Sequence, residues 1–547
     1  MTGPGLLTAL WLTPLVGALV VVVLPHRARR AAQPLALATS LVVLGAAVAL
    51  TVGFEPGGAT HQFVESRPWI PAFGATYSLG LDGVALVLVL LTAALMPLLL
   101  LAGWNGQDDV DGPDAADAAD GRRTQLHPAL MLATQGLALV AFTSLDVLLF
   151  YVAFEAMLIP LYFLIGGFGR TDSDGGDTGG AGADRARAAV RFLIYNLLGG
   201  LVMLAAVIGL YAQTAQAGLG AGGVSGAAGP TGGSGGPGAA GTFDYRVITE
   251  AIADGRLEIS TGAALLMFAG FTLAFAIKAP LWPFHTWLPG AAVAATPTSA
   301  VLMMAVVDKV GTFAMLRYSL PLFPDAADAA APVLVTLAVI SIIYGGLMAI
   351  AQTDLLRLIA YASISHFGFI VLGIFAVTEL SMAGSTLYMV NHGIATAALF
   401  LVAAFLVRRR GTRQIGGYGG VQQVAPVLSG VFLIAGLATL SLPGLAPFIS
   451  EILVFIGAFG VYPVVAVLAT STFVLAAIYI LWTYQRVMGG PVADGVEGVV
   501  DLGVRERVVL APLVVALIVL GFYPQPTLDV IDPPVAQTVA HVEGAAR

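Results

Sequence analysis

The sequence predicts an all-α polytopic membrane protein, and three observations support that prediction. The chain has 547 residues, of which 58% are hydrophobic and only 10% are charged, and its mean hydropathy is +0.91. A soluble chain would carry about 25% charged residues. Apolar runs of about 20 residues recur along the chain, which is the length that crosses a hydrocarbon core of about 30 Å. Arginines gather between these runs, as they do in the loops of membrane proteins.

The apolar runs predict about 14 transmembrane helices. The first run lacks a basic start and a small-residue cleavage site, so we expect a retained helix and not a secretory signal. The predicted helices, numbered in chain order, cover approximately residues 5–24, 32–53, 79–101, 127–144, 146–168, 189–212, 262–281, 297–319, 331–351, 355–377, 382–407, 426–450, 462–487 and 506–523.

Helices 7 and 12 are predicted to be broken. Helix 7 contains Lys278-Ala279-Pro280, and helix 12 contains Ser441-Leu442-Pro443-Gly444, where proline removes backbone hydrogen bonds. The equal spacing of the breaks predicts two inverted five-helix repeats, helices 4–8 and helices 9–13. Paired breaks in inverted repeats indicate a transport route near the middle of the membrane. Ordinary proline kinks are the alternative interpretation.

These repeats predict four parts of the chain. We expect N-terminal helices with an acidic loop, a first repeat with a disordered loop at about 214–242, a second inverted repeat, and a last helix with a C-terminal tail. Three low-complexity segments, at 105–123, 169–187 and 218–241, are interpreted as tolerated insertions. The four predicted parts are residues 1–126, 127–319, 331–487 and 488–547.

The arginines predict the orientation of the chain. Loops after odd-numbered helices hold most of them, whereas loops after even-numbered helices hold Arg67, Arg246, Arg256 and Arg317. Because basic loops stay in the cytoplasm, odd-numbered loops should be cytoplasmic and both termini should lie outside the inner (plasma) membrane. The arginines of the odd-numbered loops are Arg27, Arg29, Arg30, Arg122, Arg123, Arg170, Arg185, Arg187, Arg191, Arg357, Arg408, Arg409, Arg410, Arg413, Arg486, Arg505 and Arg507.

Several ionisable residues interrupt the apolar segments, and they are the candidate functional residues. A charge in hydrocarbon costs roughly 3 kcal/mol, so such residues usually mark an ion route. Four of them lie about 9–12 residues into their segments, near mid-depth, which predicts a row along the membrane plane. The chain has two lysines, and both belong to this set. The candidates are Glu155, Lys278, Lys309, His366, His392 and Glu451.

The residue types in this row suit proton transfer. A buried lysine can release its proton whereas arginine stays charged, and histidine titrates near neutral pH. Simpler interpretations remain for each residue. Glu155 could be a neutral structural carboxyl, and Lys278 could extend toward the membrane surface. The two histidines could be structural, and Glu451 could cap a half-helix.

Other chemistries find little support in the sequence. Cysteine is absent, which excludes disulfides, thiolate metal sites and iron–sulfur ligation. The glycine-rich tract at 218–241 lacks the strand–turn–helix context of a phosphate loop. The two histidines lie on separate predicted helices without a further haem signature. We therefore expect no cofactor, no metal and no nucleic-acid partner; the expected partners are the lipid bilayer and protons.

Four stretches of this sequence resemble a known family. FEAMLIPLYFLIGG, FTLAFAIKAPLWPFHTWLPGAAVAATPTSAVLMMAVVDKVGTFAMLRY, QTDLLRLIAYASISHFGFI and LPGLAPFISEILVF look like the antiporter-like subunits of respiratory complex I. The resemblance covers nearly the whole chain apart from the three low-complexity segments. The chain is most similar to the M-type branch, because it ends after about 14 helices and carries Glu451 where most relatives have lysine.

The resemblance implies a function. It implies a proton-translocating subunit of an NADH:quinone oxidoreductase without its own redox centre, placed between L-like and N-like antiporter subunits. It also implies that Glu155 and Lys278 form the key pair, that Lys309 and the two histidines continue the relay, and that Glu451 lies at the exit end. Subunits of Mrp-type sodium/proton antiporters or membrane-bound hydrogenases, and a purely structural scaffold, are the alternatives.

This sequence departs from the family pattern at several positions. Phe154 stands where tryptophan is usual, Leu356 where lysine is common, and Asp308 where the family has an apolar residue. None of these departures removes a presumed relay residue. Asp308 adds a charge directly beside Lys309, so the balance of charge around this lysine differs from the family pattern.

Overall fold

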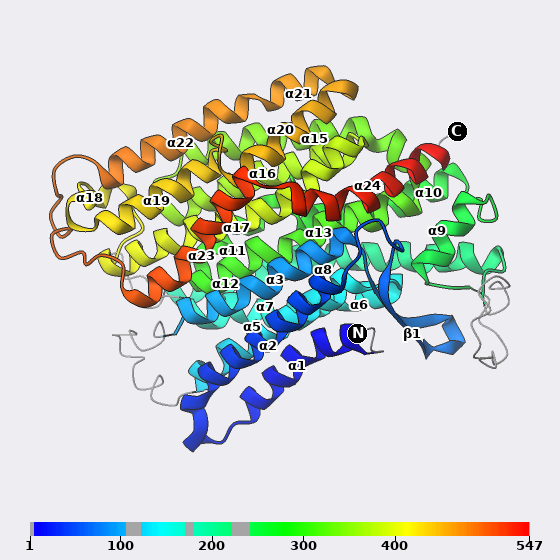
Figure 1. Ribbon diagram of the computed structural model, residues 1–547, viewed down its shortest axis with the longest axis horizontal. Helices are drawn as coiled ribbons and strands as arrows, with labels where there is room; N and C mark the ends of the chain where they lie inside the picture. Colours follow the sequence, from blue (N-terminus) through cyan, green and yellow to red (C-terminus); the bar gives the residue numbers. More distant parts are fainter. Residues whose placement is uncertain (1–4, 105–121, 170–179, 221–240, 546–547) are drawn as a thin grey trace.

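Long apolar helices make up most of the computed structural model, which describes residues 5–104, 122–169, 180–220 and 241–545 (Figure 1). Within these ranges 12 helices are long and apolar enough to cross a membrane, and up to 13 if one bent pair counts as a single span. The predicted all-α membrane fold is confirmed. The count of 14 spans stays a prediction, because the twelfth predicted segment consists of two shorter apolar helices.

The helices of the first half, in chain order, begin and end as follows. They are α1 (Leu6–Val23), α2 (Ala32–Gly53), α3 (Gly83–Ala102), α5 (Arg122–Thr143), α6 (Val147–Ala156), α7 (Leu158–Phe168), α8 (Gly180–Gln216), α9 (Tyr245–Ala253), α10 (Thr261–Lys278), the short η3 (Phe284–Trp287), α11 (Leu288–Ala294), α12 (Pro297–Leu302), the π-helical η4 (Met303–Val307), α13 (Asp308–Ala314), the π-helical η5 (Met315–Ser319) and α14 (Leu320–Leu322).

The second half continues in the same way. Its helices are α15 (Pro324–Ile350), α16 (Leu355–Phe375), α17 (Glu379–Arg410), α18 (Val421–Val424), α19 (Pro426–Thr439), α20 (Ala446–Val461), α21 (Pro463–Ala469), α22 (Ser471–Met488), α23 (Val504–Phe522) and α24 (Gln525–Ala545).

A two-stranded hairpin accompanies the helices. Strands β1 (Gln62–Ile70) and β2 (Ala75–Leu81) are antiparallel, with Glu65 opposite Leu79. No apolar run indicates these strands, because a strand of mixed residues is shorter and more polar than a membrane span. The third span therefore begins at Gly83 and not at about residue 79.

Helix α8 is longer than its predicted segment, and a helix that was not predicted follows α23. The arginines of the fifth loop that lie at 185, 187 and 191 belong to α8, which is 37 residues long. The predicted C-terminal tail is largely the helix α24, which bends by 69° from α23.

The ends of the loop predicted at about 214–242 are joined, since Thr242 N donates to Thr214 Oγ1 at 3.1 Å. The predicted disorder of its middle part, and most of the other two low-complexity segments, lie outside the described residues.

Both predicted helix breaks are present. Helix α10 ends at Lys278, and the chain then continues through the short helices η3 and α11. Helix α19 ends at Thr439, and α20 begins at Ala446. Between α19 and α20, Ser441 adopts a positive φ of 60°, a conformation that few non-glycine residues adopt.

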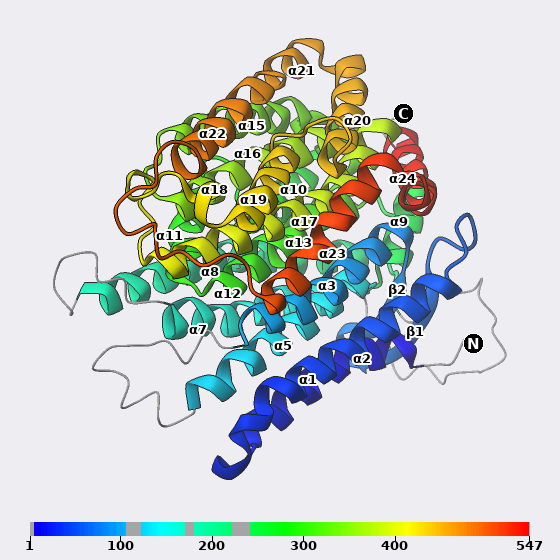
Figure 2. The ribbon, with the colours of Figure 1, turned by 60° about the vertical axis from the view of Figure 1, so that its left-hand side comes forward.

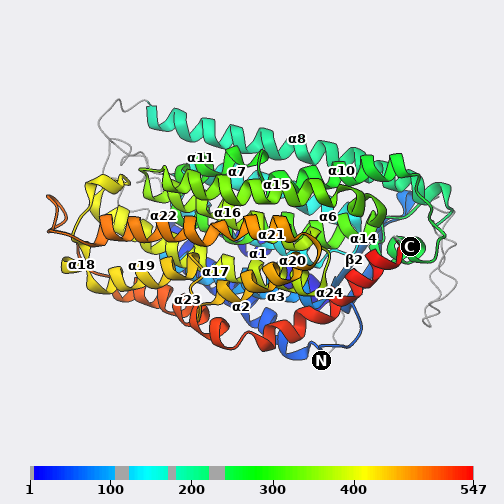
Figure 3. The ribbon, with the colours of Figure 1, turned by 90° about the horizontal axis from the view of Figure 1, so that it is seen from above.

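The most buried helices are those that carry the lysine–histidine part of the row. In the span of α12–α14 and in α17, an apolar stretch of 18 residues is wholly buried inside the molecule, and in α16 94% of such a stretch is buried. By contrast, α1 and the α21–α22 segment are each 33% buried, and they lie at opposite edges of the molecule (Figure 2). Figure 3 shows α8 along one edge, with α23 and α24 along the other. Helices α16, α17 and α12–α14 therefore form the interior of the bundle.

Candidate functional site

Lys309 lies at the centre of this interior and contacts a histidine on another helix. It is the second residue of α13, which begins directly after the π-helical turn η4, and its side chain is 0% exposed. Its Nζ atom lies 2.6 Å from His392 Nδ1 on α17 and donates to the Met304 carbonyl at 2.5 Å. The ring of Phe367 lies 4.6 Å from the same Nζ atom. The amine is thus held against the imidazole.

His392 leads to the second histidine of the row. The ring centroids of His392 and His366 on α16 are 5.4 Å apart. His392 Nε2 lies 3.1 Å from Ser363 Oγ and 3.2 Å from Thr396 Oγ1. Because a hydroxyl can both donate and accept, either of these side chains can exchange a proton with the imidazole.

Tyr388 connects His366 to Glu451. Its hydroxyl donates to Glu451 Oε1 and contacts His366 Nδ1, while His366 Nδ1 and Glu451 Oε1 are 3.6 Å apart. All three side chains are buried. Glu451 is the sixth residue of α20, whose N-terminus has no side-chain cap, so the interpretation of Glu451 as a helix cap is not supported. The histidine, the phenol and the carboxyl form one continuous contact chain.

Lys278 and Glu155 lie near each other without a direct ion pair. Lys278 is the last residue of α10 and is 0% exposed, so it does not extend to the surface. Its Nζ atom donates to the Phe154 carbonyl at 3.3 Å and lies 4.4 Å from the Phe154 ring centroid. Among the described residues no ion pair within 4.0 Å joins Lys278 to Glu155, although the two charges interact electrostatically.

Gly200 on α8 determines the space around the Glu155 carboxylate. A Cβ atom added at Gly200 would overlap this carboxylate. The neighbouring Gly199 faces α10, because its Cβ would lie 2.9 Å from Ile277 Cδ1. The two glycines therefore let α8 approach both the helix that carries Glu155 and the helix that carries Lys278.

Three residues near the row were not among its predicted members. Tyr388 lies four residues before His392 on α17, and a helix places such residues on one face, so spacing could have indicated it. Asp308 was noted as a departure from the family without a role. Gly200 could not have been found, because its importance comes from contact with Glu155 on another helix.

A second buried polar cluster lies near the hairpin. Arg317 pairs with Asp82 at 2.5 Å, and His61 Nε2 lies 2.9 Å from the Arg317 guanidinium. Asp82 also caps α3 by accepting from Ala85 N at 2.8 Å. Burial, and then the positive charge of Arg317, lower the pKa of His61 to about 4. His61 is therefore neutral at pH 7, so the cluster holds one buried ion pair and an uncharged imidazole.

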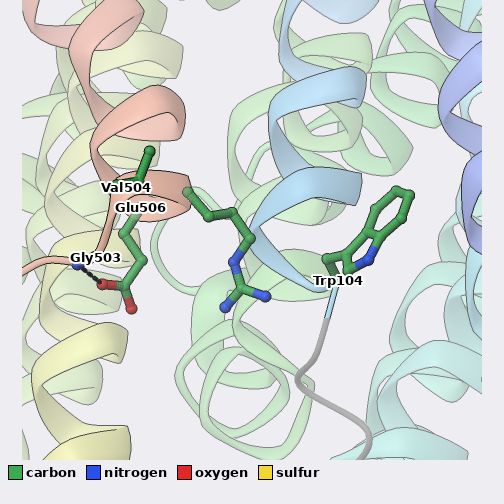
Figure 4. Close-up of a pocket in the computed structure, with 5 residues that line it drawn as sticks. Trp104, Gly503, Val504 and Glu506 are labelled. Carbon is green, nitrogen blue, oxygen red and sulfur yellow. Dashed lines mark hydrogen bonds between the residues drawn. The ribbon is translucent and has the colours of Figure 1, made fainter.

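One surface pocket lies apart from the row. It has a volume of about 440 Å³ and is lined by residues at the end of α3 and the start of α23, including Trp104 (Figure 4). The Glu506 carboxylate there accepts from Gly503 N at 2.8 Å and pairs with Arg409 at 2.5 Å. Within the described ranges, no group of three or more histidine, cysteine, aspartate or glutamate residues could hold a metal ion. The pocket thus lies at the N-terminus of α23, and Glu506 of the same helix already caps that N-terminus.

Comparisons with known proteins agree with this geometry. The family described as "NADH:quinone oxidoreductase/Mrp antiporter, TM" matches residues 144–476. A curated NADH-quinone oxidoreductase subunit M from Mycobacterium tuberculosis is 52% identical, with 98% of this chain and 94% of the relative covered. The subunit M from Rhodobacter capsulatus is 34% identical, with coverage of 98% and 96%.

Solved structures give the same result. A chain of respiratory complex I from Thermus thermophilus superposes with a TM-score of 0.80 at 30% identity, covering 98% of this chain and 99% of the other. A chain of the Mrp complex from Dietzia has a TM-score of 0.76 at 20% identity, with coverage of 99% and 100%, and this likeness shows the fold alone.

The protein is therefore a multi-pass membrane subunit of the antiporter-like class. The chain belongs to the NADH:quinone oxidoreductase/Mrp antiporter family, within its subunit M branch.

Proposed function

We propose that this chain is a proton-translocating membrane subunit of an NADH:quinone oxidoreductase. The observation that carries the proposal is the buried chain of titratable side chains in the interior. Lys309 contacts His392, and Tyr388 bridges His366 and Glu451. Titratable groups are costly inside a membrane unless they serve transport. These groups come from four separate helices and form two contacting sets, whose histidine rings are 5.4 Å apart between centroids.

The row supports a stepwise mechanism. A change at the Glu155–Lys278 end alters the electrostatic stabilisation of the proton on Lys278, and protons then pass through Lys309 and the two histidines toward Glu451. Moving one charge against 100 mV costs about 2.3 kcal/mol. Coulomb energies between charges a few ångströms apart reach that scale at the reduced dielectric of a protein interior. Rearrangement of charge pairs can therefore supply the work of translocation.

The surroundings of the chain follow from the same proposal. We place it in the inner (plasma) membrane, with odd-numbered loops in the cytoplasm and both termini outside. Its helices form two inverted five-helix repeats, over residues 127–319 and 331–487, and L-like and N-like subunits flank it. The chain itself binds no cofactor, since electron transfer takes place in other subunits. Support comes from the arginine-rich odd-numbered loops and from the subunit M relatives.

The test is proton pumping by the assembled oxidoreductase in closed vesicles. Glu155→Gln and Lys278→Ala each remove one charge, and we expect either change to lower the protons moved per NADH oxidised by about tenfold. Asp325→Asn is the control, because Asp325 is exposed at the start of α15 and should pump normally. Normal pumping by both charge variants in an assembled complex would instead favour a structural scaffold. Sodium-dependent proton movement without NADH would favour the antiporter class.

A further inference from the structure

Asp308 is a buried carboxylate to which the relay described above gives no role. It is the first residue of α13, and its side chain is 0% exposed. Within the described part of the chain, neither of its carboxylate oxygens has a hydrogen-bond partner. Burying a polar group without a partner costs several kcal/mol at most sites, and a charged one in a membrane costs more unless a charge of opposite sign lies near. Its position among the lysines therefore matters.

The face of α13 that carries Asp308 packs against the break in α10. Gly311 lies three residues after Asp308, and residues at this spacing share a helix face. A Cβ atom on Gly311 would lie 2.8 Å from both Ala279 N and Phe275 O. These atoms belong to the last turn of α10, which ends at Lys278. Asp308 thus lies on the side of α13 that faces Lys278.

Lys309 is directed away from that side. Consecutive helical residues project about 100° apart, and Lys309 Nζ is held by His392 and the Met304 carbonyl. Asp308 interacts electrostatically with both Lys278 and Lys309. Asp308 thus adjoins Lys309 in the chain and lies on the face of α13 that is turned toward Lys278, and no hydrogen bond among the described residues joins the two lysines directly.

We propose that Asp308 is a further proton-transfer residue that carries protons from Lys278 to Lys309. In the first step an N–H bond of the Lys278 ammonium breaks and an O–H bond forms on Asp308, which leaves a neutral amine and a neutral carboxylic acid. In the second step this O–H bond breaks and an N–H bond forms on the neutral Lys309 amine, which restores the carboxylate. The proposal rests on the proton-translocating function proposed above and inserts one step into it.

The test compares three variants in the assembled oxidoreductase. Asp308→Asn keeps the shape but cannot carry a proton, so proton pumping should fall by about tenfold or more. Asp308→Glu keeps the titratable group and should restore at least about half of the pumping. Lys309→Met removes a member of the relay proposed above and should abolish pumping. Asp325→Asn is again the matched control.

The outcomes separate the two proposals. If Lys309→Met abolishes pumping while Asp308→Asn pumps normally, the relay stands and the role of Asp308 is overturned. If Lys309→Met pumps normally, the proposed function itself fails.

Infrared difference spectroscopy during turnover separates a carrier from a fixed countercharge, and it needs only the Asp308→Glu variant. A carrier becomes protonated, so a carboxylic acid band of the parent should shift to a different frequency in that variant. An unchanged set of carboxylic acid bands would mean that Asp308 never takes up a proton, and it would overturn the proposal.

Discussion

Tyr388 lies between His366 on α16 and Glu451 on α20 and contacts both. Because its hydroxyl donates to Glu451 and lies against a histidine ring nitrogen, it can accept a proton from one side while it releases one to the other. At the scale of single residues, the proposed relay therefore includes a phenol as well as its charged members. Its ordinary titration range lies far above neutral pH, so a hydroxyl relays protons without storing them.

Replacing Tyr388 with phenylalanine tests this role. Tyr388→Phe keeps the ring and removes the hydroxyl, so we expect proton pumping per NADH oxidised to fall by about tenfold while the complex still assembles. Tyr484→Phe is the control, because Tyr484 packs on Phe432 outside the row, with ring centroids 6.4 Å apart. Equal pumping by the two variants would show that His366 and Glu451, which are 3.6 Å apart, exchange protons without the phenol.

The residue types of the site were predictable, but their contacts were not. Depth along each predicted helix placed Lys309, His366 and His392 at one level, and the structure brings these three together. The resemblance to the family implied a direct pair of Glu155 and Lys278. In the structure the Lys278 amine contacts the Phe154 carbonyl instead, because the way α6 and α10 pack decides which atom of α6 meets the lysine.

At the scale of elements, helix breaks and glycines position the charged residues. Helix α10 ends at Lys278, so the chain leaves the helix where the charge must be buried. Helix α8 approaches through Gly199 and Gly200, which lack the side chains that would keep the helices apart. The break was predictable from its prolines. The close approach of α8 was not, because glycine is common throughout this chain and only its neighbours distinguish one glycine from another.

Gly200→Ala tests the close approach of α8. The added methyl group would overlap the Glu155 carboxylate, so that the carboxylate must move. Overpacking of this kind costs about 1–3 kcal/mol, and we expect a lower thermal unfolding temperature together with several-fold weaker pumping. Gly182→Ala on the same helix is the control, because nothing lies within 4 Å of its added Cβ. A pumping rate equal to that of the control would show that Glu155 does not need its present position.

At the scale of the whole molecule, segments that are far apart in the sequence lie at the same end of the bundle. The hairpin and the end of α24 lie toward the same end of the bundle as α9, while α18 lies at the other end (Figure 1). This arrangement agrees with the predicted alternation of loops. Which end faces the cytoplasm remains the prediction of the arginine distribution, because the bundle itself contains no membrane reference.

The absence of cysteine permits a direct test of that orientation. A single cysteine can be introduced by Ala59→Cys between α2 and β1, or by Gly498→Cys between α22 and α23, and both positions are exposed. We expect a membrane-impermeant thiol reagent to label the first variant in intact cells and the second only after the membrane is opened. The reverse pattern would invert the proposed orientation.

The sequence by itself determined the class of the protein, the positions of most helices and both helix breaks, and it named the six candidate residues of the proposed row. These properties are local, because twenty apolar residues must span a bilayer and proline must interrupt a helix wherever the two occur. Only the tertiary structure decided that Tyr388 joins a histidine to a glutamate, that Gly200 makes room for Glu155, and that Asp308 faces the end of α10. These relations arise between helices far apart in the chain, and the packing of complete helices sets them.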